Sequence, residues 1–444
     1  MLINYPNKTI QYSFSDLIHC ILRNKNISTQ NIDTTVILHQ KIDSQINQLA
    51  LASGLCFRAC INLAVISGAG IAGLCTSFEL LARGYKVIIA EKRGTFSRSN
   101  IINFNIEIQR FLKKFHLLKE FEASVAARIK SHRIVHIGKK GTEELLLSDV
   151  SKLELSNLSF KPKNYNKLFN DDGIYSIKIK DIQTFLANKA LQAGVQIFGN
   201  VQVKLISSEQ QKDRSKVELI GNTPLQSSRK LKPHLIFIAE GAHSSTAECL
   251  DLKTKRVKNN CTDEHWIYGN VNYSGKKTFV VSIVDTSQNT LRIANVIFNA
   301  KLKEINIAVT SEGSVSKENI QNELINVVKT AFALEQIQQS PGPLTASVDR
   351  TVRVKNEKRK IFSKGNVFLI GDSAGNSSPL AGLGGTLCLT LIPATVVQLL
   401  NDSERQPDHR HKNFQTFSEA YISRWMQKSD QVKQFCINMF NKNI

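Results

Sequence analysis

An α/β fold with a parallel sheet is predicted for this 444-residue chain by three features of its sequence. Residues 61–67 (INLAVIS) form an apolar run of the length and composition typical of a strand buried on both faces. A glycine-rich turn, a helical periodicity over 74–83 and a second strand over 85–90 follow without interruption. Short apolar runs recur at 235–239 and 367–370, so we expect the sheet to gather strands from distant parts of the chain.

A second, β-rich domain is indicated by the stretch between these strands. The segments 278–284, 291–298 and 305–310 are short, β-branched and separated by turn residues, which is typical of an antiparallel sheet. Helical periodicity returns over 317–334. The predicted organisation is a helical N-terminal extension over 1–60, a discontinuous nucleotide-binding domain over 61–110, 175–250 and 350–400, an inserted substrate domain over 111–174 and 251–349, and a C-terminal helical segment over 401–444.

The last hundred residues carry two helical signals. A helix is expected over 386–400, with Pro393 either kinking it or opening its second part. The C-terminal segment places four aromatic residues at helical spacing, and this stripe is predicted to pack in the core. Its members are Phe414, Phe417, Tyr421 and Trp425.

The charge balance favours anionic partners. Lysine and arginine outnumber aspartate and glutamate by 58 to 37, which gives a net charge of +21 and a pI near 9.6. Such a protein attracts nucleotides, acidic proteins or lipid headgroups, whereas no nucleic-acid-binding module is recognisable and no nucleic-acid partner is predicted. Two basic runs, for which solvated loops are the simpler interpretation, contain Lys253, Lys255, Arg256 and Lys258, and Arg353, Lys355, Lys358, Arg359 and Lys360.

Cysteine usage and hydropathy predict a cytoplasmic protein. The eight cysteines form no C-x-x-C pair, and no His/Cys cluster has ligand spacing, so neither a disulfide framework nor a metal site is expected. The first residues lack the apolar region of a signal peptide. The longest apolar run, 59–75, contains three glycines and is short for a membrane span, so no span is predicted.

The strongest motif is Gly68-x-Gly70-x-x-Gly73, which lies between a strand and a helix. Gly68 would allow the tight turn, Gly70 the approach of a pyrophosphate, and Gly73 the close packing of helix on sheet. The N-terminus of the helix would direct unpaired N–H groups at the phosphates. Glu91 ends the next strand, 23 residues after Gly68, where a carboxylate can bind ribose hydroxyls. This arrangement predicts a dinucleotide site on a Rossmann-type domain.

Several further stretches resemble one known family. Residues 88–100 (IIAEKRGTFSRSN) resemble the end of the second strand in class A flavoprotein monooxygenases, and are most similar to the MICAL monooxygenase domain. Residues 175–191 resemble the family's strand and helix around an FAD-contacting arginine. Lys180 stands at the position of that arginine, so the positive charge is kept but the bidentate hydrogen bonding of a guanidinium is lost. Residues 367–385 (VFLIGDSAGNSSPLAGLGG) closely resemble the family's third nucleotide fingerprint.

The resemblance implies FAD as the cofactor and assigns residues to it. Asp372 would accept a hydrogen bond from the ribityl chain, and main-chain groups of the Pro379–Gly384 loop would approach the flavin ring. Arg98 and Asn100 would lie near the flavin or its phosphates. The implied cofactor-binding set is Gly68, Gly70, Gly73, Glu91, Lys92, Arg93, Arg98, Asn100, Lys180, Gly371, Asp372, Pro379, Gly382 and Gly384.

Besides Lys180, the family's second and third fingerprints each contain a departure from the usual pattern. Residues 237–245 (FIAEGAHSS) resemble its second fingerprint but carry Glu240 where aspartate is usual. In the family this fingerprint has a role related to NAD(P)H, so the substitution bears on that role. Gly385 and Thr386 follow the last glycine pair where asparagine is usual, which concerns one contact to the flavin ring.

The resemblance further implies an NAD(P)H-dependent monooxygenase. In that family NAD(P)H reduces FAD, and the reduced flavin and oxygen form a C4a-hydroperoxide that oxidises the substrate. Because the cofactor carries this chemistry, no catalytic side chain is assigned. MICAL proteins oxidise methionines of actin, so an acidic protein such as actin is one expected substrate, beside a small aromatic or a lipid-like molecule.

Three alternatives share the fold. A flavin-dependent reductase or dehydrogenase of a lipid-like substrate would turn over anaerobically. A halogenase would carry a W-x-W-x-I-P signature, which is missing because Trp266 and Trp425 lie far apart. A non-catalytic binding protein would be compatible with the substitutions at Lys180, Glu240 and Gly385. Neither the oligomeric state nor the choice between NADH and NADPH follows from the sequence.

Overall fold

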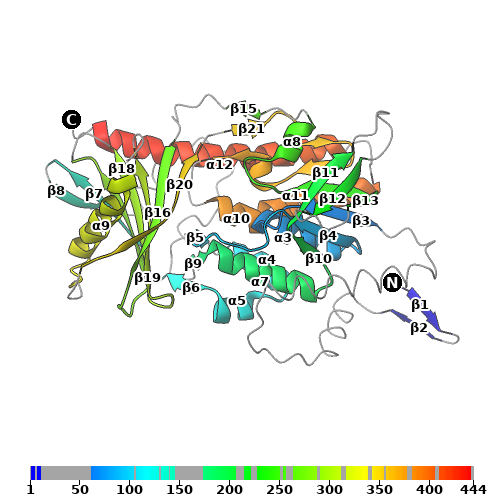
Figure 1. Ribbon diagram of the computed structural model, residues 1–444, viewed down its shortest axis with the longest axis horizontal. Coiled ribbons are helices and arrows are strands. Elements are labelled where there is room, and N and C mark those ends of the chain that lie inside the picture. The colour runs from blue at the N-terminus through cyan, green and yellow to red at the C-terminus, as the bar shows by residue number, and fades with distance from the viewer. Residues whose placement is uncertain are drawn as a thin grey trace. The chain divides into compact units, whose positions relative to one another are not determined.

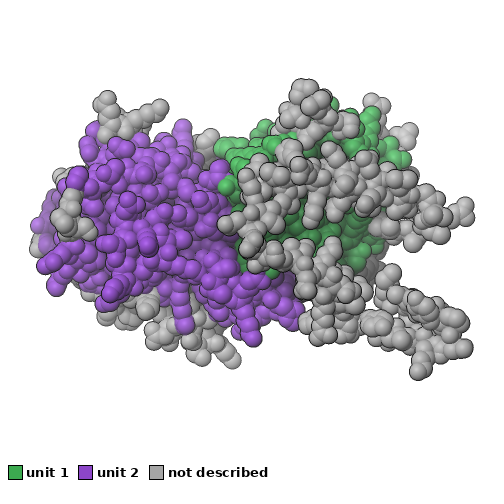
Figure 2. Space-filling view, turned by 60° about the horizontal axis from the view of Figure 1, so that its bottom comes forward, with its two compact units in different colours: residues 1–96, 183–251, 363–373 green, residues 97–182, 252–362, 374–444 purple. Residues whose placement is uncertain are grey.

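The structure is a computed structural model of the chain (Figure 1). It describes residues 2–5, 8–11, 62–104, 107–129, 132–139, 141–145, 174–206, 215–221, 228–250, 254–256, 264–287, 291–311, 317–338, 343–354, 357–377, 383–405 and 410–441. Two compact units are distinguished by colour in Figure 2. Unit 1 comprises residues 1–96, 183–251 and 363–373, and unit 2 comprises residues 97–182, 252–362 and 374–444.

Unit 1 is built on a six-stranded sheet in which five neighbouring strands run parallel. In two of these strands, β14 and β23, every residue is buried, as is typical of a parallel sheet covered on both faces. The predicted parallel sheet is therefore confirmed. Its order is β10 (Gln196–Gly199), β4 (Lys86–Glu91), β3 (Leu63–Ser67), β14 (Leu235–Ile238), β23 (Val367–Leu369) and the antiparallel β22 (Ser363–Lys364).

The helix α3 (Ile71–Leu81) connects β3 to β4 and packs against both strands. Every residue from Ile71 to Leu80 is buried, and Gly84, with a φ of 76°, turns the chain out of the helix. Unit 1 also contains the antiparallel strands β11 (Val201–Ile206), β12 (Lys216–Gly221) and β13 (Arg229–Leu231), the short helix α8 (Ser245–Cys249) and the 3-10 turn η3 (Gly371–Ser373).

The predicted helical extension over residues 1–60 is wrong for its first part. The strands β1 (Leu2–Tyr5) and β2 (Lys8–Gln11) pair antiparallel, with Ile3 opposite Ile10. β-Branched residues in both segments, together with Tyr5 in β1, favour strand over helix, which explains the difference. The remainder of the predicted extension, 12–60, lies outside the described residues.

Unit 2 is built on a seven-stranded sheet that is antiparallel except for the parallel pair β17 and β7. The helix α9 (Lys317–Leu334) covers one face, where Leu324 and Val328 pack with Val296 and Ile307. Both the antiparallel sheet and this helix agree with the prediction. The strand order is β20 (Ala346–Val354), β16 (Glu264–Asn272), β19 (Glu304–Ser311), β18 (Arg292–Asn299), β17 (Phe279–Asp285), β7 (His132–Gly138) and β8 (Gly141–Leu145).

Two small sheets complete the β-structure described for unit 2. One contains β5 (Ile101–Phe104), β9 (Ile174–Lys178) and β6 (Ala127–Ile129), and its residues Ile101 and Ile129 pack on Val280 and Ile297 of the large sheet. The other contains β15 (Thr254–Arg256), β21 (Glu357–Arg359) and β24 (Gly375–Asn376). The accompanying helices are α4 (Ile108–Lys114), α5 (Leu118–Ser124) and the start of α7 (Ile179–Gln192).

The C-terminal part of unit 2 contains α10 (Leu383–Leu389), α11 (Leu391–Arg405) and α12 (Arg410–Asn441). Pro393 stands in the first turn of α11, where its missing N–H removes no helical hydrogen bond. Of the two predicted outcomes, the structure has the one in which Pro393 lies at the start of a second helix. The stretch Gly384–Asp402 has the length and hydropathy of a membrane span, and half of it is buried inside the protein.

The aromatic stripe of α12 is buried at three of its four members. Phe414, Tyr421 and Trp425 are buried, whereas Phe417 is 45% exposed. At 3.6 residues per turn, Phe417 lies about 60° around the helix from the other three, which explains why the prediction is wrong there.

The compact units have different boundaries from the predicted domains. Four segments that the sequence assigns to the nucleotide-binding domain cluster with unit 2 instead, namely residues 97–110, 175–182, 350–362 and 374–400. The strand pairing of β5 with β9 and the packing of α10 on β5 account for two of these segments.

Candidate cofactor-binding site

The turn after β3 requires glycine at two positions because of the surrounding backbone. Gly68 has a φ of 106°, and a Cβ placed there would lie 2.4 Å from the carbonyl oxygen of Ala239. A Cβ at Gly73 would lie 2.2 Å from the carbonyl oxygen of Gly68. Both distances are far below van der Waals contact, so folding itself demands these two glycines.

Gly70 differs from its neighbours in the motif. Among the described residues beyond its own helix and its chain neighbours, the nearest atom to a Cβ there would be the carbonyl oxygen of Ala239, at an ordinary 3.8 Å. Gly70 is the N-cap of α3, and the helix has neither a side-chain cap nor an acidic residue in its first turn. The first N–H groups of α3 are therefore suited to an anion, and the missing Cβ is explained by the close approach of a ligand rather than by folding. These features fit the pyrophosphate of FAD.

The carboxylate of Glu91 is held against this turn. Its Oε2 accepts a hydrogen bond from the Ala69 N–H at 2.8 Å, and its Oε1 accepts one from the Arg93 N–H at 3.1 Å. Each carboxylate oxygen keeps a further lone pair for ribose hydroxyls. Lys92 and Arg93 follow at the exposed end of β4, and their predicted contacts with the adenosine stay predictions.

The third fingerprint follows β23 in unit 1. Gly371 turns the chain with a φ of 60°, and Asp372 lies partly exposed in η3. The Ser373 hydroxyl donates to the Gly241 carbonyl at 3.2 Å, which joins this turn to the segment after β14. Pro379 and Gly382 lie outside the described residues.

Gly384 and Gly385 belong to α10 of unit 2, where packing explains both glycines. A Cβ at Gly384 would lie 3.1 Å from the Trp425 ring, and one at Gly385 would lie 2.9 Å from Ile102 and 3.0 Å from Phe104. The departure from the family at Gly385 thus lets α10 pack closely on β5.

The segment 98–100 of unit 2 is fixed from two sides. The carbonyls of Arg98 and Asn100 accept hydrogen bonds from the Lys180 and Ile179 N–H groups at 2.8 and 3.1 Å. On the other side, the Ser99 hydroxyl donates to Asp349 Oδ1 at 2.8 Å, and Asn270 donates to the same oxygen at 3.4 Å. Asn100 is 4% exposed. Its Oδ1 has no hydrogen-bond partner within the described part of the chain, so it can accept one from a ligand.

Replacing Asp349 with alanine is expected to weaken FAD binding about tenfold, because the segment 98–100 loses one of its two attachments. Fluorescence titration of the apoprotein with FAD measures this affinity. Asp285→Ala is a matched control, since Asp285 accepts from the Ser287 hydroxyl at 2.7 Å in the same large sheet. Equal FAD affinities in the two variants would contradict a specific role for Asp349.

A partly buried polar chain crosses the large sheet of unit 2. The Ser282 hydroxyl donates to Asn295 Oδ1 at 2.6 Å, and therefore accepts from His132 Nε2 at 2.8 Å. Burial lowers the pKa of His132 to about 4 from the usual 6.5, so this ring is neutral near pH 7.

Stability is expected to fall as the pH drops from 6.5 to 4. In this window the unfolded chain protonates His132 and the folded chain does not, so acid favours unfolding, by about 2 kcal/mol over the window. Urea unfolding across this range checks the effect. The slope should decrease in His132→Gln and stay unchanged in His243→Gln, which removes an exposed histidine. Equal slopes in all three proteins would contradict the assignment.

Several solved structures share this fold. CmlS, a flavin-dependent halogenase, aligns with a TM-score of 0.63 and 15% identity over 84% of this chain, and this chain spans 64% of its length. The p-nitrophenol 4-monooxygenase PnpA from Pseudomonas putida DLL-E4 aligns with a TM-score of 0.59 and 16% identity, over 85% of this chain and 89% of its own. The peptidyl tryptophan dihydroxylase QhpG aligns with a TM-score of 0.58 and 12% identity, over 87% of this chain and 77% of its own. At these identities the likeness shows the fold.

No curated protein matches this chain in sequence. The family described as FAD binding domain matches residues 63–389, which include β3, α3, β4 and the third fingerprint. The predicted cofactor FAD is confirmed by this match, while the narrower likeness to MICAL stays a prediction. The chain belongs to the FAD binding domain family and is an FAD-dependent enzyme with the flavoprotein monooxygenase fold.

Proposed function

We propose that this enzyme is an NAD(P)H-dependent monooxygenase. The observation that carries the proposal is the turn at Gly70, where a ligand can approach the uncapped N-terminus of α3 beside the Glu91 carboxylate. FAD, when bound, supplies the transfer of electrons from a nicotinamide to dioxygen.

The chain's own residues bind and orient the cofactor in this proposal. The N–H groups in the first turn of α3 hold the pyrophosphate, Glu91 binds ribose hydroxyls, and Asp372 accepts from the ribityl chain. Asn100 offers its buried Oδ1 as an acceptor. Arg98 and Lys180 supply positive charge to an anionic cofactor.

An acidic protein such as actin is the substrate that the charge distribution favours. β15 pairs with β21, so that Lys255 lies opposite Lys358, and the two basic runs of the sequence meet in one small sheet of unit 2. Lys358 also pairs with Glu419 at 2.7 Å, while Lys360 is exposed. A cluster of positive charge accelerates encounter with an acidic protein. QhpG acts on a peptidyl tryptophan, so the fold is compatible with a peptide substrate.

The first test of the proposal is a visible spectrum of the purified protein, followed by aerobic addition of NADPH or NADH. We expect flavin absorption, release of FAD on denaturation, and nicotinamide oxidation that consumes oxygen. Turnover of an added lipid-like acceptor without oxygen would instead identify a reductase or dehydrogenase. Chlorination or bromination of an aromatic substrate would identify a halogenase. A colourless protein that cannot be reconstituted with FAD would contradict the proposal.

The substrate is tested by incubating the FAD-loaded enzyme with F-actin and NADPH and analysing actin by mass spectrometry. Methionine sulfoxide that depends on NADPH and persists with catalase present is the expected product. Unmodified actin, with NADPH consumed, would exclude actin and direct screening to small aromatic or lipid-like molecules.

A further inference from the structure

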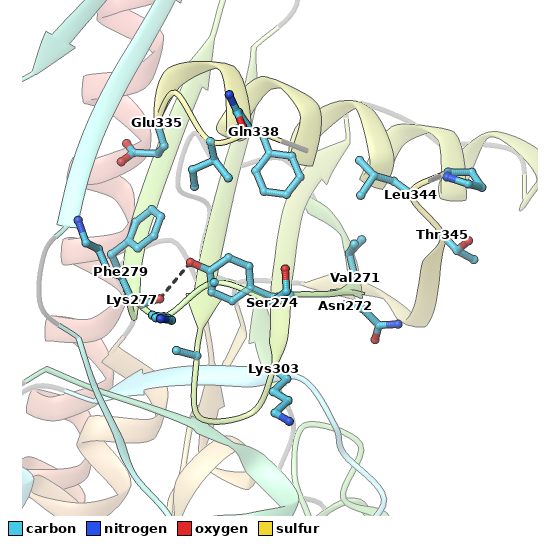
Figure 3. Close-up of a pocket in the computed structure, with 17 residues that line it drawn as sticks. Val271, Asn272, Ser274, Lys277, Phe279, Lys303, Glu335, Gln338, Leu344 and Thr345 are labelled. Atoms are coloured by element: carbon cyan, nitrogen blue, oxygen red, sulfur yellow. Dashed lines mark hydrogen bonds between the residues drawn. The ribbon is translucent and has the colours of Figure 1, made fainter. Parts of the chain in front are cut away.

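A cavity of about 1010 Å³ opens in unit 2, on the face of the large sheet that α9 covers (Figure 3). It lies between the turn that joins β16 to β17 and the C-terminal end of α9. Its size is at the upper end of the range found for small-molecule sites, roughly 300–1,000 Å³. None of the described residues assigned to FAD lines it.

One side of this cavity is apolar, while the rest of the lining includes the polar residues Asn272, Ser274 and Gln338. Phe279 and Phe332 are buried members of the core between the sheet and α9, and Ile337 and Leu344 pack against that core. Figure 3 shows Phe279 and Leu344 among the side chains that surround the opening. This lining is suited to an apolar group of a ligand, since burying it removes apolar surface from water.

The rim of the cavity is basic. Lys276, Lys277 and Lys303 line it and are all exposed. The carboxylate of Glu335 also lines the cavity, but it pairs with the Arg133 guanidinium at 2.6 Å, which balances its charge. The charge left at the rim is positive, which attracts an anionic group.

Tyr273 holds the two lysine-bearing segments in place. Its N–H donates to the Lys303 carbonyl at 2.9 Å, and its hydroxyl donates to the Lys277 carbonyl at 3.2 Å. The ring packs edge-on against Phe298 of the core, with centroids 5.4 Å apart. A Cβ at Gly275 would lie 2.2 Å from this ring, so the turn needs glycine to pass over it. The backbone at both lysines is thus ordered before any ligand arrives, which lowers the entropic cost of binding.

We propose that this cavity binds an amphipathic carboxylate, a molecule with an apolar body and one anionic head. The apolar body packs against the aromatic and aliphatic wall, and the carboxylate lies among the three lysines of the rim. This site shares no described residue with the set assigned to FAD, and the proposal does not depend on the oxidation chemistry.

Dodecanoate, used below its micelle concentration, is the probe, and isothermal titration calorimetry on the FAD-loaded full chain is the measurement. We expect one dodecanoate per chain, with dodecyltrimethylammonium binding at least tenfold more weakly because its head is cationic. The single variants Lys277→Glu and Lys303→Glu should each weaken dodecanoate binding severalfold. Lys329→Glu, which reverses an exposed lysine of α9 outside the cavity, is the matched control and should bind as the wild type does.

Three outcomes would overturn the proposal. Equal affinity for the cationic amphiphile would show that only the apolar chain is recognised. Equal weakening by Lys329→Glu would show a general effect of net charge. A change in flavin absorption with the same dissociation constant as dodecanoate binding would place the ligand at the cofactor instead.

Tyr273→Phe, which removes one hydrogen bond to the rim and keeps the ring, should weaken binding about threefold.

Discussion

Gly70→Val is expected to lose FAD while the apoprotein stays folded. The described part of the chain leaves room for a side chain at this position, since its nearest atom to a Cβ, outside the helix itself, lies 3.8 Å away. The backbone of Gly70 is extended, with φ −66° and ψ 169°, which a valine can adopt. The new methyl groups would, however, occupy the space in front of the first N–H groups of α3, where the pyrophosphate binds. We expect FAD affinity to fall at least about a hundredfold, which corresponds to about 3 kcal/mol.

The FAD content from visible absorption, and the affinity from fluorescence titration, measure this loss. Thermal unfolding of the apoprotein, followed by circular dichroism, tests the fold. Gly68→Ala and Gly73→Ala are the comparison, because their Cβ atoms would lie within 2.4 and 2.2 Å of backbone oxygens and should destabilise the apoprotein by several kcal/mol. If Gly70→Val keeps wild-type FAD affinity, the pyrophosphate does not approach this turn.

The sequence predicted the parallel sheet of unit 1 because strands buried on both faces appear as continuous apolar runs. β3, β14 and β23 are of this kind, and all were located from their composition. The prediction was wrong where short segments carry weak patterns. At residues 2–11 strand pairing decides the structure. Phe417 shares the spacing of its neighbours only approximately, and a rotation of about 60° suffices to expose it.

The cofactor motif was also predictable, because Gly68, Gly70, Gly73 and Glu91 form one local strand–helix–strand unit. The contacts of Asp349 could not be predicted, because its partner Ser99 lies 250 positions away in the sequence. No local pattern reports a hydrogen bond between such distant residues. The motif assigns the turn to Gly68, the approach of a ligand to Gly70 and close packing to Gly73, and the contacts of each missing Cβ agree with that division, with 2.4 and 2.2 Å at Gly68 and Gly73 against 3.8 Å at Gly70.

Glu240 illustrates a departure from the family that structure explains. Its Oε1 accepts from the hydroxyls of Ser67 and Thr246, each at 2.5 Å, and its Oε2 accepts from the Ser244 hydroxyl at 2.8 Å. Ser244 in turn caps α8 by accepting from the Ala247 N–H at 3.1 Å. One carboxylate therefore joins the end of β3, directly before Gly68, to the first turn of α8.

Glu240→Ala is accordingly expected to destabilise the protein by about 3 kcal/mol or more, because three buried hydroxyls lose a charged acceptor. Glu240→Asp, which restores the residue usual in the family, should give an intermediate loss, since a side chain shorter by one methylene cannot reach both β3 and α8 without a backbone shift. Urea unfolding of the apoprotein measures both values, and Glu248→Ala on the same helix, away from the network, is the control. A Glu240→Asp variant as stable as the wild type would show that the extra methylene is not needed. Glutamate at this position would then be a neutral exchange rather than the link that fixes the turn on which FAD binds.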